Sequence, residues 1–385
     1  MTKFESLQAF YKGKRVLITG HTGFKGSWLA LMLHRLGAEV YGYALEPPTE
    51  PALFQLLQLE KDIHSEIGDI RDFPHLQRFF ETARPEIVLH LAAQPIVRTS
   101  YLYPRETFET NVMGTVNILE ALRLYNEAHD EKVRSFLNVT TDKVYENPEQ
   151  ADHAFREDEK LDGYDPYSNS KSCSELVTHS YQKSFFSTTG SAAPETAIST
   201  ARAGNVIGGG DFAKDRIIPD CVRDTMAGKT IHVRNPYSTR PYQHVLEPLY
   251  VYLLIAMQQA VGGKNDTEGD EGAPEALAGS YNVGPDEVDA ITTGALADLF
   301  VESWGEGASW HSDAEADAPH EAAYLKLDTR KLKERFHWQP RWHVTEAVQE
   351  TVAWYHAFSE GADLRALTEQ QIDAFLADEA EKSRT

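Results

Sequence analysis

Three glycines between an apolar run and a helical pattern constrain this chain more than any other feature of its sequence. Residues 16–18 form a short apolar run that is typical of a buried parallel strand. Gly20, Gly23 and Gly26 follow at three-residue spacing, and apolar residues then recur with a helical period up to position 36. Glycine permits a tight turn and a close backbone approach, and the first turn of a helix offers free N–H groups to a phosphate. The segment therefore predicts the phosphate-binding start of a dinucleotide fold.

Length, charge and cysteine content narrow the kind of protein. The chain has 385 residues, of which 41% are hydrophobic, and this suits a large α/β domain with a smaller companion. The N-terminus lacks a secretory apolar segment and no run approaches about 18 apolar residues, so we expect a cytoplasmic protein without a membrane span. The formal net charge of −22 argues against nucleic acid as a partner and leaves adaptation to high salt open. Cys173 and Cys221 lack metal-ligand partners at useful spacing, so we expect buried free thiols and no metal site.

The second and fourth predicted strands bear on the cofactor. No Asp or Glu closes the second strand at 39–45, where an acidic residue would bind the adenosine ribose of NAD, and Glu46 comes slightly late. No arginine pair suited to the 2′-phosphate of NADP follows, so this strand leaves NAD and NADP open. The fourth strand ends with Ala92 and Ala93, whose small side chains let a cofactor lie close at the edge where ligands of open α/β sheets bind.

A fifth predicted strand and the helix that follows it carry the candidate catalytic groups. The strand ends with Thr141, Asp142 and Lys143. Tyr167 and Lys171 are four residues apart, so a helix places both side chains on one face. Alone, this Tyr-x-x-x-Lys spacing is weak evidence, but behind the glycine loop and the threonine-rich strand end it indicates a catalytic pair.

These motifs together resemble a known group of enzymes. The spacing Gly-x-x-Gly-x-x-Gly after Thr19, with Tyr-x-x-x-Lys at 167–171, resembles the extended branch of the short-chain dehydrogenase/reductase superfamily, which acts on nucleotide sugars. The string Thr-Gly-His-Thr-Gly-Phe-Lys-Gly-Ser-Trp-Leu at 19–29 is similar to the opening of the CDP-glucose 4,6-dehydratases. Asp-Lys at 142–143, where dTDP-glucose and GDP-mannose dehydratases have Asp-Glu, is the most specific feature of this resemblance. The resemblance covers roughly residues 10–358.

The resemblance implies a Rossmann-type doubly wound parallel sheet with a smaller C-terminal α/β substrate domain. We expect an NAD-binding domain at 1–203, with segments near 238–257 returning to it, and a mainly nucleotide-sugar-binding domain at 204–360. Residues 361–385 would form a charged C-terminal extension with a peripheral helix. In such enzymes the helices corresponding to 111–122 and to the stretch after Tyr167 often form a four-helix contact, so we expect a homodimer or homotetramer. An ordinary pair of helices covering the sheet remains the alternative.

The implied reaction converts CDP-D-glucose to CDP-4-keto-6-deoxy-D-glucose and water, a step of deoxysugar biosynthesis. Oxidation at C4 makes the C5 hydrogen acidic, the 6-hydroxyl leaves as water, and the hydride returns to C6. There is no net redox change, so the resemblance implies a tightly bound NAD that is regenerated in each turnover. The chain would be an NAD-dependent hydro-lyase.

The resemblance also implies a role for each catalytic side chain. Tyr167 would be the base that takes the 4-hydroxyl proton, because the ammonium of Lys171 lowers its pKa. Lys171 would also hold the nicotinamide ribose, and Thr141 would hydrogen-bond the sugar 4-oxygen. Asp142 would protonate the departing hydroxyl, and Lys143 would remove the C5 proton.

The remaining site residues are implied by position in the same family. Cofactor contacts are expected, beside Tyr167 and Lys171, from the glycine loop and from the ends of the third and fourth strands: Gly20, Thr22, Gly23, Phe24, Lys25, Gly26, Asp69, Ile70, Leu91, Ala92 and Ala93. Substrate contacts are expected from five polar side chains: Gln94, Asn205, Arg216, Arg234 and Arg240. A surface ion pair is the alternative for Arg234, while the guanidinium of Arg240 suits a diphosphate. Relatives often have a second diphosphate arginine where this chain has Pro-His-Glu at 319–321.

Two other functions stay open at this point. Another nucleotide-sugar 4,6-dehydratase or a 4-epimerase of the same fold would share Tyr167 and Lys171, although an epimerase does not need the pair Asp142 and Lys143. A non-enzymatic NAD-binding regulator is a remote alternative, because such proteins typically lose the tyrosine or the lysine. Loops at 187–195 and 262–274 carry no chemistry that their residues indicate.

Overall fold

The computed structural model describes residues 3–186, 196–262, 277–312 and 324–382. The loop expected at 187–195, nearly all of the loop expected at 262–274, and the Pro-His-Glu stretch at 319–321 lie outside the described residues. Within them, no helix is both long enough and apolar enough to cross a membrane.

A seven-stranded parallel sheet is the centre of the fold, and it confirms the predicted Rossmann-type architecture. Its order is β11-β6-β5-β4-β1-β2-β3. Its strands are β1 (Arg15–Thr19), β2 (Glu39–Ala44), β3 (His64–Ile67), β4 (Ile87–His90), β5 (Ser135–Thr141), β6 (Ala197–Ala203) and β11 (Gly279–Val283). The strand order reverses direction between β1 and β4, so a crevice opens there at the carboxyl ends of the strands.

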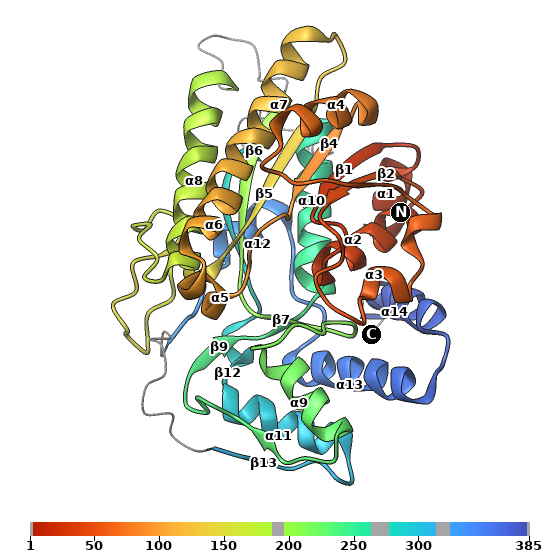
Figure 1. The fold of residues 1–385 in the computed structure, drawn as a ribbon, viewed down its shortest axis with the longest axis vertical. Coiled ribbons are helices and arrows are strands. Elements are labelled where there is room, and N and C mark those ends of the chain that lie inside the picture. Colours follow the sequence, from red (N-terminus) through yellow and green to blue (C-terminus); the bar gives the residue numbers. More distant parts are fainter. Residues whose placement is uncertain (1–2, 187–195, 263–276, 313–323, 383–385) are drawn as a thin grey trace.

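Helices cover both faces of this sheet (Figure 1). One face is covered by α2 (Phe24–Arg35) and α10 (Leu246–Val261), with α1 (Lys3–Tyr11) behind them. The other face is covered by α4 (Phe73–Ala83), α7 (Gly114–Ala128) and α8 (Pro166–Phe185). Side chains of one strand alternate between the two cores, since Val16 and Ile18 pack with α2 and α10 while Leu17 packs with α4 and α7. Both faces are buried, which explains the continuous apolar runs of the central strands.

Shorter helices join these layers at the carboxyl edge of the sheet. They are α3 (Leu53–Leu56), α5 (Val97–Leu102), α6 (Pro104–Phe108), a π-helical turn (Glu109–Met113) that leads into α7, and single 3₁₀ turns at Leu59–Lys61 and Asp142–Val144. The 3₁₀ turn after β5 holds the Asp-Lys pair that the sequence singled out.

A smaller α/β part lies below the carboxyl edge of the sheet in Figure 1. It contains three two-stranded pairs, β7 (Val206–Ile207) with β10 (Gln243–His244), β8 (Ile231–His232) with β13 (Trp310–His311), and β9 (Thr239–Pro241) with β12 (Ala290–Thr292). Its helices are α9 (Ile217–Met226), α11 (Thr293–Trp304) and α13 (Val344–Glu360), while α12 (Arg330–Phe336) packs on β11, outside this part. The strand expected at 323–328 is reduced to single bridges from Tyr324 to Thr239 and from Leu327 to Phe155.

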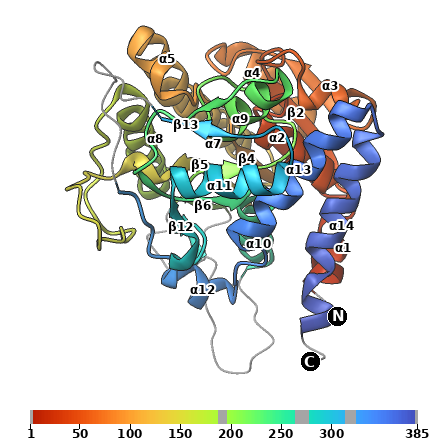
Figure 2. The ribbon, with the colours of Figure 1, turned by 90° about the horizontal axis from the view of Figure 1, so that it is seen from below.

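The C-terminal helix α14 (Leu364–Lys382) is not peripheral, and here the sequence prediction was wrong. Ile372 and Phe375 are fully buried, because the helix packs against α1, α2 and α13 (Figure 2). Arg341 donates a 2.6 Å hydrogen bond from Nη1 to the carbonyl of Phe375 and ties the helix to the loop before α13. The high charge of the segment conceals a narrow apolar stripe, and the stripe determines where the helix lies.

The chain crosses between the two parts more than once. After β10 of the smaller part, α10 returns to cover β4, β5 and β6, and β11 then joins the large sheet beside β6. Both cysteines are free, but only Cys221 is buried, because Cys173 lies on a half-exposed side of α8.

Candidate active site

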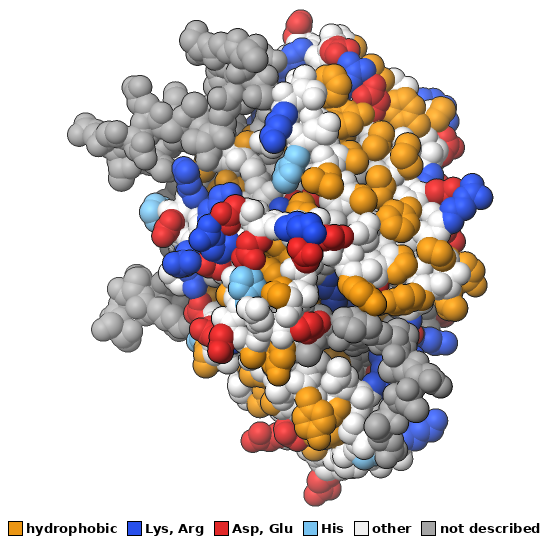
Figure 3. All heavy atoms as spheres, turned by 90° about the vertical axis from the view of Figure 1, so that its left-hand side faces the viewer, with side chains coloured by type: hydrophobic (Ala, Val, Ile, Leu, Met, Phe, Trp, Pro, Cys, Tyr) orange, Lys and Arg blue, Asp and Glu red, His pale blue; other side chains and the backbone are white. Residues whose placement is uncertain are grey.

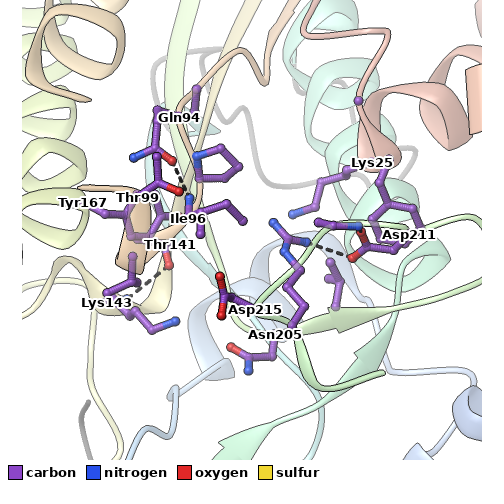
Figure 4. A pocket seen from close by; sticks show the side chains of 18 of the residues that line it. Lys25, Gln94, Ile96, Thr99, Thr141, Lys143, Tyr167, Asn205, Asp211 and Asp215 are labelled. Carbon is purple, nitrogen blue, oxygen red and sulfur yellow. Dashed lines mark hydrogen bonds and ion pairs between the residues drawn. The ribbon is translucent and has the colours of Figure 1, made fainter. Parts of the chain in front are cut away.

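One cavity of about 1640 Å³ lies between the carboxyl edge of the sheet and the smaller part (Figure 4). All the predicted cofactor, substrate and catalytic residues line it: Gly20, Thr22, Gly23, Phe24, Lys25, Gly26, Asp69, Ile70, Leu91, Ala92, Ala93, Gln94, Thr141, Asp142, Lys143, Tyr167, Lys171, Asn205, Arg216, Arg234 and Arg240. The topology thus brings together residues from segments that are far apart in the sequence.

The glycine loop packs so closely against its own backbone and the end of β4 that side chains at Gly20 and Gly26 would clash. Gly20 has a φ of +83°, and a Cβ on it would lie 2.9 Å from the backbone nitrogen of Ala92. A Cβ on Gly26 would lie 2.1 Å from the carbonyl oxygen of Gly20. Gly23 is the N-cap of α2 and has no side chain, so among the described residues no side chain caps the N–H groups of the first turn, which lines the cavity. Free N–H groups at a helix N-terminus fit the diphosphate of a dinucleotide.

The opposite end of this groove is formed by β2 and β3. Asp69 lines the cavity, but its carboxylate is occupied by Arg71, whose Nη2 lies 2.6 Å from Oδ2. Ile70 is buried beside it. Glu46, one residue beyond the position expected for a ribose ligand, also lines the cavity. A carboxylate at this point favours a ribose hydroxyl over a 2′-phosphate.

The end of β5 presents a buried carboxyl group with one unsatisfied oxygen. Thr141 donates a 3.0 Å hydrogen bond from Oγ1 to Oδ1 of Asp142, and Asp142 is only 1% exposed. The other oxygen, Oδ2, has no hydrogen-bond partner among the described residues. A Cβ on Gly204 would come within 3.2 Å of that oxygen, so glycine there leaves room beside it. An unpaired buried carboxylate oxygen is costly, and a proton or a ligand hydroxyl would relieve that cost.

The side chain of Lys143 extends into the cavity on the same side (Figure 4). Its backbone N–H is held by Oγ1 of Thr141 at 3.4 Å. Among the described residues, no hydrogen bond or ion pair of its ammonium group occurs. The ammonium is therefore free to act on a ligand.

Helix α8 supplies the tyrosine and the lysine. Asp165 caps the helix by accepting a 3.0 Å hydrogen bond from the backbone of Ser168. Tyr167 and Lys171 are both buried on the face toward β5, as their spacing predicts. Lys171 donates from Nζ to the carbonyl of Val139 at 3.0 Å.

Burial dominates the protonation of both groups. It raises the pKa of Tyr167 to about 12, although a hydrogen bond with Thr141 acts in the opposite direction. Burial lowers the pKa of Lys171 to about 8, against the charge of Glu175, which raises it. The charge of Arg216 also lowers the pKa of Tyr167.

The predicted substrate-binding arginines line the cavity in different surroundings. Arg216 lies 3.1 Å from Asp211, and Arg234 lies 2.6 Å from Asp215. Arg240 is buried, with only 4% of its surface exposed. The alternative that Arg234 forms an ion pair is therefore realised, but the pair lies in the cavity rather than on the outer surface.

The two remaining substrate candidates, Gln94 and Asn205, also line the cavity. Both polar atoms of Gln94 are engaged, since Oε1 accepts from the N–H of Ile96 at 2.7 Å and Nε2 donates to Thr107 at 2.9 Å. The side chain of Gln94 thus holds the loop after β4 in place. Asn205 follows β6 and lies near Asp215 in Figure 4.

Sequence reasoning missed several polar residues of the cavity. Asp211 forms an ion pair with Arg216, and Asp215 forms one with Arg234. The Nε atom of Arg98 lies 3.8 Å from Oδ1 of Asp215. The ammonium of Lys25, expected only as part of the loop, reaches into the cavity and lies 3.4 Å from the hydroxyl of Tyr252. Burial lowers the pKa of Lys25 to about 7. A basic residue shortly after a strand end was the signal available for Arg98.

Comparison with known proteins agrees with this geometry. The family model described as GDP-mannose 4,6 dehydratase matches residues 17–351. A curated CDP-glucose 4,6-dehydratase from Salmonella typhimurium is 45% identical over 368 residues, which cover 96% of this chain and 98% of the relative. The chain belongs to the GDP-mannose 4,6-dehydratase family. Within this family of extended short-chain dehydrogenase/reductases, a dTDP-glucose 4,6-dehydratase from Neisseria gonorrhoeae is 23% identical and covers 89% of this chain and 95% of its own length.

Solved structures confirm the fold of this family member. A UDP-glucuronic acid 4-epimerase from Bacillus cereus in complex with UDP-glucuronic acid and NAD has a TM-score of 0.71 at 20% identity, covering 89% of this chain and 99% of its own. A dTDP-glucose 4,6-dehydratase from Bacillus anthracis in complex with NAD has a TM-score of 0.68 at 19% identity, covering 91% and 99%. At such identities the likeness concerns the fold alone.

Proposed function

We propose that this protein is an NAD-dependent CDP-glucose 4,6-dehydratase. The observation that carries the proposal is the pair Asp142 and Lys143, which lies in one cavity with Tyr167 and Lys171. A 4-epimerase needs only the tyrosine and the lysine, whereas a dehydratase also needs an acid and a base for the C5–C6 bond. The 45% identity to the curated Salmonella typhimurium CDP-glucose 4,6-dehydratase supports the choice of nucleotide.

The cavity suits NAD as the resident cofactor. The first turn of α2 and the tight glycine loop before it would hold the diphosphate, and Lys171 would hold the nicotinamide ribose. Glu46 would accept from the adenosine ribose and would repel a 2′-phosphate. When bound, NAD supplies a positive charge, the acceptor for the C4 hydride and the donor that later returns it to C6.

Tyr167 is the base for the 4-hydroxyl proton in this proposal. With a pKa of about 12, the phenol is protonated at neutral pH and has to be activated by its surroundings. Thr141 hydrogen-bonds it and the charge of Arg216 acts in the same direction. Substrate binding expels water from the cavity and strengthens both interactions, because charges interact more strongly in a low dielectric.

Asp142 and Lys143 divide the elimination between them. The unsatisfied Oδ2 of Asp142 is placed to carry the proton that the leaving 6-hydroxyl takes. The amine of Lys143, which lines the same cavity, would abstract the C5 proton.

The arginines with their carboxylate partners would receive the substrate diphosphate. Arg234 and Arg216 each form an ion pair with an aspartate in the structure. A diphosphate carries more charge than one carboxylate and accepts bidentate hydrogen bonds, so it competes well for both guanidinium groups. Arg240 would add a third guanidinium, since its buried side chain lines the same cavity.

The decisive experiment is a comparison of substrates. The purified protein is incubated separately with CDP-glucose, dTDP-glucose, UDP-glucose and GDP-mannose, and 4-keto-6-deoxy sugar is detected by its absorbance in alkali. We expect product from CDP-glucose at a rate well above that from the other three. Formation of a C4 epimer without loss of water would replace the proposal by an epimerase. Product from another nucleotide alone would retain the reaction and overturn the choice of base.

The proposed enzyme is a homodimer or homotetramer that associates through α7 and α8. Large apolar side chains are exposed on and beside these helices, including Met113 at 50%, Leu176 at 54% and Leu102 at 73% exposure. Figure 3 faces this side of the molecule and shows hydrophobic side chains, in orange, gathered over its upper right. An apolar patch of this kind on helices that already cover the sheet favours a contact with a second copy.

The same proposal places the enzyme in the cytoplasm. Both cysteines are free thiols, which suits a reducing compartment. Sugar nucleotides and NAD are also cytoplasmic metabolites. Fractionation of the source cells with detection of the native protein tests the assignment.

A further inference from the structure

A buried carboxylate lies behind the candidate active site. Glu175 follows Lys171 by four residues and Tyr167 by eight, so the three side chains lie along one side of α8. Glu175 is 0% exposed and does not line the cavity. It therefore cannot touch a substrate or a cofactor, yet it lies directly beyond the two residues that would.

All the hydrogen-bonding capacity on the two oxygens of Glu175 is directed at the neighbouring strands. Oε1 accepts from the hydroxyl of Thr140 at 2.5 Å and from Nε of Arg202 at 3.0 Å. Oε2 accepts from the hydroxyl of Thr200 at 2.7 Å and from Nη2 of Arg202 at 2.9 Å. The paired guanidinium is 1% exposed, so this is a fully desolvated, bidentate ion pair.

Arg202 extends the contact to the far end of the catalytic segment. Its Nη1 donates to the hydroxyl of Tyr145 at 2.8 Å and to the carbonyl of Glu157 at 3.0 Å. The hydroxyl of Tyr145 in turn donates to Oδ1 of Asn282 on β11 at 2.6 Å. Residues 140 and 145, which flank Thr141, Asp142 and Lys143, are thus both tied to one carboxylate on α8.

We propose that Glu175 and Arg202 form a positioning pair that sets the distance between the two halves of the catalytic group. One half is Tyr167 with Lys171 on α8, and the other is the 141–143 segment after β5. The inference rests on the proposed function, because it assigns roles to these same residues. A positioning pair is useful here, since one sugar has to meet a base on the helix and an acid and a base on the strand end without moving.

The pair also carries a charge toward Lys171. The charge of Glu175 raises the pKa of Lys171 against the larger effect of burial, and the pKa of Glu175 itself is lowered by Arg202 despite its burial. Other titratable groups near either residue come from four elements: Lys25, His90, Asp142, Tyr167, and His179 at 3.9 Å from Oε2 of Glu175. Glu175 is the anion whose charge raises the pKa of Lys171.

The first test compares two threonines that bond the same carboxylate. Thr140→Val removes the hydrogen bond between Glu175 and the residue that precedes the catalytic segment. Thr200→Val removes an equivalent hydrogen bond to β6, at a residue that does not line the cavity. We expect Thr140→Val to lower kcat on CDP-glucose about tenfold with little change in KM. Thr200→Val should leave kcat within about twofold of wild type at a similar midpoint of thermal unfolding. Equal losses in both variants would reduce the pair to a purely structural feature and overturn the proposal.

The second test measures the pH dependence of kcat/KM, because a purely structural role of Glu175 would leave that dependence unchanged. Glu175→Gln removes the charge that raises the pKa of Lys171, so the ammonium is lost at lower pH. We expect the alkaline limb of kcat/KM to move down by about 1 pH unit, while Glu175→Asp, which keeps the charge, leaves the limb in place and lowers kcat. An unmoved limb in folded Glu175→Gln would contradict the proposal. Should Glu175→Gln fail to fold, the threonine comparison decides.

Binding of the dinucleotide separates this inference from the proposed reaction. NAD binding to wild type and to Glu175→Gln is followed by quenching of tryptophan fluorescence across the same pH range. If wild type converts none of the four nucleotide sugars, the proposed function fails, and the pH dependence of NAD binding still tests the pair. A shift in that dependence of the same direction supports it, and identical curves for the two proteins would overturn it.

Discussion

At the scale of single residues, the candidate site combines polar groups that the fold holds in or beside one cavity. Burial raises the pKa of Tyr167, the proposed base, to about 12. Asp142 is buried with one oxygen unsatisfied, and Lys143 extends an ammonium into the cavity. Buried titratable groups in a cavity are typical of active sites, where the bound substrate completes the electrostatic environment.

Replacing Tyr167 tests the first proton transfer. Tyr167→Phe removes only the hydroxyl, so the helix and the cavity should keep their shape. We expect turnover of CDP-glucose to fall by about 10²–10⁴-fold, the usual contribution of a positioned base, with NAD still bound after purification. Tyr164→Phe, at an exposed tyrosine three residues earlier, serves as control and should stay near wild type. More than a tenth of the wild-type rate in Tyr167→Phe would show that another group is the base.

Replacing Lys143 separates oxidation from elimination. Lys143→Met keeps the length of the side chain and removes the amine that would take the C5 proton. We expect product formation to fall about 10²-fold or more, while oxidation at C4 still proceeds and the absorbance of reduced nicotinamide builds up on mixing with CDP-glucose. Lys214→Met, at another lysine of the same cavity, is the matched control. Normal product formation by Lys143→Met would make this lysine structural.

At the scale of elements, prediction from the sequence succeeded where the signal is local. The glycine loop and the spacing of Tyr167 and Lys171 depend on turn geometry and on the helical period, so both can be read from adjacent residues. The pairs of Arg98 and Arg234 with Asp215 could not be predicted, because the topology brings Arg98 and Arg234 together from distant segments. The burial of α14 was missed for a different reason, since its apolar stripe is narrow and its surroundings are charged.

The packing of α14 makes a quantitative prediction. Phe375 is fully buried and meets the rings of Trp342 and Tyr250 at centroid distances of 5.1 and 6.0 Å. Phe375→Ala should lower the free energy of unfolding by about 3–5 kcal/mol, measured by urea denaturation. Gln370→Ala, at an exposed position of the same helix, should change it by less than about 0.5 kcal/mol. Similar values for both variants would mean that α14 does not pack on the core in solution.

At the scale of the whole molecule, the exposed apolar side chains of the α7 and α8 region predict association. Leu176→Arg places a charge in the proposed contact between copies. We expect light scattering coupled to gel filtration to show a dimer or tetramer for wild type and a smaller species for the variant. Met226→Arg, at a similarly exposed methionine on α9, is the control and should leave the mass unchanged. A wild-type monomer would refute the proposed contact.

The late arrival of β11 has a consequence for synthesis. A ribosome delivers β6 by residue 203, but the strand that covers its open edge is not made until residues 279–283. During that interval the backbone groups of residues 199–203 lack their partner, and the apolar side of β4, β5 and β6 waits for α10. An uncovered edge beside an uncovered apolar face is the pattern that leads nascent chains to aggregate or to bind chaperones. The larger part of this enzyme therefore cannot finish folding before the first elements of the smaller part, β7 to β10, have been translated.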